Sequence, residues 1–214
     1  MLKRWGVRDA IMRYLITSNK VSAKEIYQQR RVLYAYHEAG HAVVWHVVGG
    51  LVEQVSIASS QADYRGYCRF GFLIPKLDDH QSPDEWLQRG RIDPRTVTAY
   101  YAGMLALAFY CASYGGEDDY VEGSEQDDLE KIDSLLPQLS PDEQQRSKLK
   151  EACWQEAQKL LSDNWPAVQA LATKLLKRGV LDGKEVHRII WQTIGYPDAD
   201  WRLQALNIKR GSVK

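Results

Sequence analysis

Two histidines and a glutamate stand at a spacing that suits metal chemistry. His37, Glu38 and His41 form the pattern His-Glu-x-x-His inside an apolar segment, residues 32–45. If this segment is a helix, residues four apart lie one turn apart on the same face, so the two imidazoles can bind one metal ion. Glu38 then lies beside them, where its carboxylate can take a proton from a water that the metal activates. The pattern predicts a zinc (Zn2+) site that hydrolyses peptide bonds, with Glu38 as the general base.

Chance is the competing explanation, because two histidines on a helix can be ordinary core or surface residues. The chain has only five histidines, and two of them fall at this spacing around a glutamate. The charge of Glu38 inside an apolar segment is costly unless it has a partner or a task. These two observations favour metal binding.

A catalytic zinc site needs a third protein ligand and an open position. The longer pattern His-Glu-x-x-His-x-x-Gly-x-x-His fails here, because Val44 and Val47 occupy the glycine and final histidine positions. His46 lies nine residues after His37, which is about half a turn away around a helix. We therefore interpret His46 as a packed or hydrogen-bonded histidine and seek the third ligand elsewhere.

An acidic segment further along the chain offers better candidates. A helix is expected to begin near its end, where Asp128 shares a face with apolar residues that must be buried. Asp127 instead shares a face with Lys131 and Ser134, which we expect to point to water. Helical phase therefore favours Asp128 over Asp127 as the third ligand, with Glu125 as a weaker choice. The structural alternative for Asp128 is to cap the helix.

Composition limits the kinds of protein that this chain can be. It has 214 residues and equal numbers of basic and acidic residues, 28 of each, which argues against a nucleic-acid partner. No apolar run reaches the roughly 18 residues of a transmembrane segment, and no secretion signal is recognisable. Three widely spaced cysteines are typical of reduced thiols, so we expect a cytoplasmic protein. We divide it into an N-terminal helical extension (1–30), a metallopeptidase-like domain (31–196) and a C-terminal tail (197–214).

The hydrophobic pattern predicts an α+β fold that is mostly α. Gly49 and Gly50 are expected to end the motif helix, which a helix beginning after Ser22 runs into or approaches. Two strands follow, within residues 51–57 and 65–74. Further helices are expected at residues 2–18, 96–112, about 128–137, 141–162, 166–177 and 183–192, with a turn at 179–182.

Residues 34–44 closely resemble the protease-domain signature of the FtsH-type ATP-dependent zinc proteases. Weaker likeness extends over roughly residues 30–192, with Asp128 in the segment that corresponds to the family's third zinc ligand. The resemblance implies a zincin-like fold, in which the motif helix adjoins a small β-sheet and a C-terminal helical bundle. It also implies a zinc metalloendopeptidase that acts on peptides or unfolded proteins and can form a homo-oligomer. Further matching segments are residues 55–57, 66–67, 102–106, 123–129, 171–176 and 181–183.

The chain departs from this family in several respects. It has no Walker A pattern, no room for an ATPase domain before residue 30 and no membrane span, so we do not expect ATP dependence. Leu107 stands where the family usually has a glutamate, and the extra Asp127 leaves the register of the third ligand ambiguous. These departures keep two alternatives open, a catalytically silent binding or regulatory module and a purely structural metal.

The second predicted strand is a candidate for substrate binding. Gly66, Tyr67 and Cys68 lie at its start. A strand at the edge of a sheet can accept an extended peptide through main-chain hydrogen bonds. We therefore expect these three residues to contact a peptide substrate.

Overall fold

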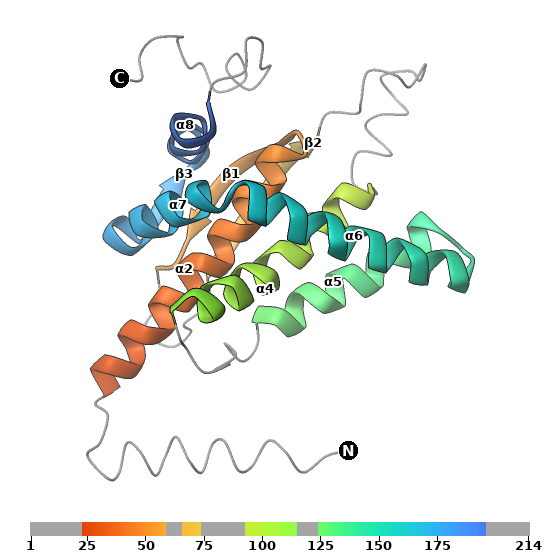
Figure 1. The fold of residues 1–214 in the computed structure, drawn as a ribbon, viewed down its shortest axis with the longest axis horizontal. Coiled ribbons are helices and arrows are strands. Elements are labelled where there is room, and N and C mark those ends of the chain that lie inside the picture. The colour runs from red at the N-terminus through yellow and green to blue at the C-terminus, as the bar shows by residue number, and fades with distance from the viewer. Residues whose placement is uncertain (1–22, 59–65, 74–92, 115–123, 196–214) are drawn as a thin grey trace.

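The computed structural model describes residues 23–58, 66–73, 93–114 and 124–195. The helix expected at residues 2–18 and the C-terminal tail lie outside this part of the chain. The described residues are mostly helical with one small antiparallel sheet, which confirms the predicted α+β class. No helix among them is long and apolar enough to cross a membrane. The elements in chain order are α2 (Ala23–Val47), β1 (Gly50–Ser56), β2 (Tyr67–Leu73), α4 (Pro94–Tyr114), α5 (Ser124–Leu139), α6 (Glu143–Asp163), α7 (Trp165–Arg178), β3 (Val180–Asp182) and α8 (Gly183–Ile194) (Figure 1).

Helix α2 carries the His-Glu-x-x-His pattern through the middle of the fold (Figure 1). It packs against α4, α6, α7 and both long strands. Every residue from 34 to 46 is buried. Because this stretch is apolar on all sides, neighbouring elements cover the whole helix and hold its few polar side chains in the interior.

The crossing of α2 and α4 is close because small residues line it. A Cβ atom placed on Gly40 would lie only 2.6 Å from the carbonyl oxygen of Ala102. Ala102 and Ala106 are themselves fully buried at this crossing. The close approach brings the α4 backbone up to the face of α2 that carries His41.

The end of α2 follows the prediction made from its glycines. The last turn closes with the amide of Val48 donating to the carbonyl of Val44, at 3.0 Å. Gly49 has a φ of 100°, a left-handed conformation that glycine adopts without strain. The chain then reverses into β1, as expected.

The sheet has the order β2-β1-β3, so β2 is an edge strand among the described residues. Strands β1 and β2 are antiparallel, with Val55 opposite Cys68 and Ser56 opposite Tyr67. On its other side β1 pairs with β3, where Val55 lies opposite Leu181. The prediction of a turn at residues 179–182 was therefore incomplete, because residues 180–182 form a strand.

Helix α5 differs most from its prediction. It begins at Ser124 and ends at Leu139, whereas the sequence suggested a start near Asp128 and an end at Pro137. Pro137 is tolerated because it lies in the last turn and removes a single N–H donor. The amide of Ser140 still donates to Leu136, at 3.0 Å. Asp128 therefore lies in the second turn of α5, and its alternative role as a helix cap was wrong.

Helix α6 starts slightly later than expected. Its N-cap is Asp142, whose carboxylate accepts a hydrogen bond from the Gln145 amide at 2.7 Å. Pro141 thus precedes the cap and is not in the first turn. This interaction fixes the corner between α5 and α6.

Candidate metal centre

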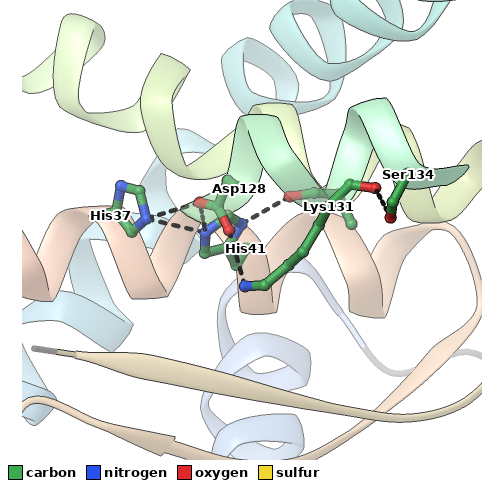
Figure 2. A network of polar contacts seen from close by, with 6 residues as sticks. His37, His41, Asp128, Lys131 and Ser134 are labelled. Atoms are coloured by element: carbon green, nitrogen blue, oxygen red, sulfur yellow. Dashed lines mark hydrogen bonds and ion pairs between the residues drawn. The ribbon is translucent and has the colours of Figure 1, made fainter. Parts of the chain in front are cut away.

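Three buried side chains from two helices meet at one point in the interior (Figure 2). His37 and His41 come from successive turns of α2, and Asp128 comes from α5. The two Nε2 atoms are 3.0 Å apart. Oδ2 of Asp128 lies 3.1 Å from Nε2 of His37 and 2.9 Å from Nε2 of His41. The structure therefore brings together the three residues that the sequence suggested as ligands.

This donor triangle suits a small divalent cation. Ligands at about 2.0–2.1 Å from a tetrahedral zinc ion stand about 3.3 Å from one another. The three donor atoms here are 2.9–3.1 Å apart, slightly inside that spacing. Two imidazoles and one carboxylate form a donor set that zinc accepts in catalytic sites.

The hydrogen bond on the far side of His41 sets its tautomer. Nδ1 of His41 lies 2.7 Å from the carbonyl oxygen of Ala99, which can only accept, so Nδ1 carries a proton. A neutral His41 then turns the lone pair of Nε2 toward the carboxylate of Asp128. Two electron-rich atoms at 2.9 Å need a cation between them, either a proton or a metal ion.

The pKa values show what holds the cluster together without metal. Burial, together with His41, lowers the pKa of His37 to about 4. Burial also lowers the pKa of His41, but the carboxylates of Asp128 and Glu38 outweigh it and raise the value to about 9. At Asp128 the effect of burial is outweighed by the two imidazoles, so its pKa lies well below the usual range. Near neutral pH the metal-free cluster thus contains neutral His37, protonated His41 and ionised Asp128.

Gly103 of α4 makes room for the two imidazoles. A Cβ atom at this position would overlap the His41 ring and lie 2.8 Å from Cε1 of His37. Because glycine has no Cβ atom, the α4 backbone can approach the metal ligands closely. The sequence placed Gly103 only in a segment that resembles the FtsH-type family and did not suggest it as a site residue, although a glycine inside an apolar helix is a general sign of such contact.

Glu38 lies beside the cluster, against the start of β2. It is 3% exposed and makes no hydrogen bond or ion pair within the described part of the chain. Burial raises the pKa of Glu38 to about 8. A Cβ atom at Gly66 would lie 2.6 Å from Oε1 of Glu38, so the absence of a side chain there accommodates the carboxylate.

The other two residues of the expected substrate strand lie on different sides of the sheet. Cys68 is partly buried and close enough to Glu38 and Asp128 for their charges, after burial itself, to raise the pKa of its thiol. Tyr67 is 43% exposed and donates a hydrogen bond from its hydroxyl to Gln54 at 2.6 Å. The structure thus places Gly66 and Cys68, but not the Tyr67 ring, beside the candidate site.

The remaining acidic and histidine candidates lie outside the triangle. Asp127 is only partly buried and does not belong to the cluster. Burial, with the Asp128 charge, raises the pKa of the partly buried Glu125 to about 7, but its carboxylate is not part of the cluster either. His46 is buried with its Nδ1 atom 2.6 Å from Nδ1 of His187 on α8, which confirms its interpretation as a hydrogen-bonded histidine. Nε2 of His187 in turn accepts from the Val52 amide.

Lys131 reaches the site, contrary to the expectation that it points to water. Its side chain is 51% exposed, yet its Nζ atom lies 3.2 Å from Oδ1 of Asp128 (Figure 2). The three-residue spacing of these two residues along a helix is one that favours such a pair and could have revealed it. Lys131 therefore contacts the carboxylate oxygen that faces away from the imidazoles.

Comparison with protein-family models and with curated proteins found no match to this chain. The chemistry of the site therefore has to be inferred from its residues.

Proposed function

We propose that this chain is a zinc-dependent metallopeptidase in which His37, His41 and Asp128 hold the metal and Glu38 is the general base. The supporting observation is the convergence of two imidazoles and one carboxylate within 3.1 Å of one another. A buried glutamate with no hydrogen-bonding partner among the described residues lies next to them. The resemblance of residues 34–44 to the FtsH-type proteases supports the same assignment.

The bound zinc and Glu38 would have different roles in peptide hydrolysis. When bound, zinc would polarise the peptide carbonyl and lower the pKa of a water toward 7. Glu38, whose pKa is about 8 without metal, would ionise more easily beside a doubly charged cation. Its carboxylate would accept a proton as the oxygen of water bonds to the carbonyl carbon. It would then pass that proton to the amine nitrogen as the C–N bond breaks.

The edge strand β2 suits an extended peptide as the substrate. Gly66, the residue just before this strand, lies against Glu38, so a peptide paired along this edge would pass the general base. Main-chain pairing does not depend on particular side chains, and it requires the substrate to be unfolded locally. We therefore propose short peptides and unfolded protein segments as the substrate class.

Cleavage of an unfolded protein by zinc-loaded wild type and Glu38→Gln tests this function. We expect both proteins to contain zinc and only the wild type to produce new peptide ends at an appreciable rate. The exposed Glu130→Gln on α5 is a matched control and should cleave like the wild type. Equal, nonzero cleavage by wild type and Glu38→Gln would exclude Glu38 as the base. Zinc binding without cleavage of any peptide would favour a catalytically silent binding module.

A further inference from the structure

The two oxygens of the Asp128 carboxylate have different partners. Oδ2 faces the Nε2 atoms of His37 and His41, at 3.1 and 2.9 Å. Oδ1 instead accepts from the ammonium of Lys131, at 3.2 Å. The carboxylate itself is buried, whereas Lys131 enters from the surface. Figure 2 shows this division, with the lysine reaching Asp128 from the side opposite His37.

Lys131 is held in this position by an aromatic ring. Its Nζ atom lies 5.0 Å from the centroid of the Tyr100 ring, within the range of a cation–π interaction. Tyr100 belongs to α4 and also contacts His41 edge to face, with ring centroids 6.3 Å apart. One tyrosine thus contacts both a metal-ligand candidate and the lysine that pairs with the third.

We propose that Lys131, held by Tyr100, is a positioning residue that makes Asp128 bind the metal through one oxygen only. This inference rests on the proposed metal centre. A carboxylate can bind a metal ion through one oxygen or through both, and the second mode uses one more coordination position. The ammonium neutralises and occupies Oδ1, so only Oδ2 remains for the metal. The position that Oδ1 would otherwise take stays open for water or a substrate carbonyl, which a catalytic site requires.

The proposed role of Lys131 also explains why a positively charged side chain lies next to a cation site. A positive side chain next to a cation site weakens metal binding by repulsion, and a lysine kept only for solubility would point into solvent. Lys131 instead turns toward the site, with its Nζ atom 3.2 Å from Oδ1 of Asp128 and 5.0 Å from the centroid of the Tyr100 ring. These two contacts hold the ammonium group beside the site, where it pairs with Oδ1.

Cobalt-loaded protein provides a test that does not depend on peptide cleavage. The visible absorption of bound Co2+ weakens when its coordination number rises. We expect Lys131→Met to show weaker absorption than the wild type at equal cobalt content, because Oδ1 becomes free to bind. Lys131→Arg, which keeps the charge and the donor, should restore the wild-type spectrum. Lys150→Met, which breaks an exposed ion pair with Asp133 elsewhere, is the matched control and should leave the spectrum unchanged.

Variants of Tyr100 separate its ring from its hydroxyl. Tyr100→Phe keeps the ring and should retain the wild-type cobalt spectrum, whereas Tyr100→Leu should shift it in the direction of Lys131→Met. Thermal unfolding of each apoprotein shows whether a variant has simply lost its fold. A Tyr100→Phe spectrum like that of Lys131→Met would overturn the role given to the ring.

Kinetic measurements then connect the ligation mode to turnover. In Lys131→Met we expect kcat to fall about 10–100-fold with KM nearly unchanged, the range found for residues that orient metal ligands. Lys131→Arg should recover most of this loss. If Lys131→Met keeps both the wild-type cobalt spectrum and the wild-type kcat, the proposal is wrong even though the protein is a peptidase. If no variant cleaves peptides but the spectra change as stated, the proposed function fails and the role of Lys131 stands.

Discussion

Replacing Gly103 with alanine should strongly weaken metal binding by this protein while leaving its fold largely intact. The added Cβ atom would lie 2.5 Å from Cε1 of His41 and 2.8 Å from Cε1 of His37, whereas ordinary contacts begin at 3.4 Å. The imidazoles must therefore move away by at least about 0.9 Å and 0.6 Å, respectively. Metal–ligand distances tolerate only about 0.2 Å. We expect zinc affinity to fall at least about 100-fold, equivalent to about 2.7 kcal/mol.

The same change should affect the free energy of unfolding much less. Alanine in place of glycine within a helix contributes about 0.5–1 kcal/mol of stability. Overpacking in a dense interior costs about 1–3 kcal/mol. The two effects partly cancel, so the metal-free variant should unfold cooperatively with a loss of about 2.5 kcal/mol or less.

Competition with a chromophoric chelator measures the affinity, and circular dichroism measures unfolding. Gly40→Ala is the informative comparison, because its Cβ atom would meet the α4 backbone at Ala102 and not the imidazoles. It should lower stability by about 1–3 kcal/mol with a smaller effect on zinc. A Gly103→Ala protein that is folded and binds zinc within threefold of the wild type would show that the added Cβ atom does not displace the two imidazoles.

Three further predictions follow from the same structure. His187→Ala should lower the free energy of unfolding by about 2–4 kcal/mol in chemical denaturation, because it leaves a cavity and removes the hydrogen-bonding partner of His46 and of the Val52 amide. The zinc stoichiometry of this variant should equal that of the wild type. The raised pKa of His41, about 9, keeps this residue protonated at pH 7, so zinc binding should release at least one proton and the apparent zinc affinity should rise as the pH increases toward 9. Calorimetry in buffers of different ionisation enthalpy measures this release, and a result of no released proton would contradict the prediction. Gly66→Ala should slow peptide cleavage at least tenfold by displacing Glu38 while zinc content stays at the wild-type level, and undiminished turnover would show that this contact does not position the base.

Local periodicity was enough to predict the elements that carry the histidines. Residues four apart on an apolar helix share a face, so the arrangement of His37 and His41 followed from spacing alone. The phase of a predicted helix likewise favoured Asp128 over Asp127. The end of α2 was predictable because a glycine can adopt the positive φ that reverses the chain.

The features that sequence could not give depend on contacts between distant segments. β3 is three residues long, too short for a periodic pattern, and it exists because β1 offers a free edge. His46 and His187 pair across 141 positions, which nothing in either local sequence indicates. Gly103 is significant only because α4 crosses α2 at that residue. The sequence suggested that this helix begins near Asp128, and only the fold shows that it begins at Ser124.

Anomalous diffraction from a crystal grown with zinc tests the proposed metal centre most directly. We expect one fully occupied zinc ion within bonding distance of Nε2 of His37, Nε2 of His41 and Oδ2 of Asp128. We also expect Glu38 to be close without being a ligand, and at least one coordination position to carry no protein atom. A zinc ion closed off by a fourth protein ligand would make the metal structural, and the absence of zinc at these three atoms would rule out the proposed metal centre.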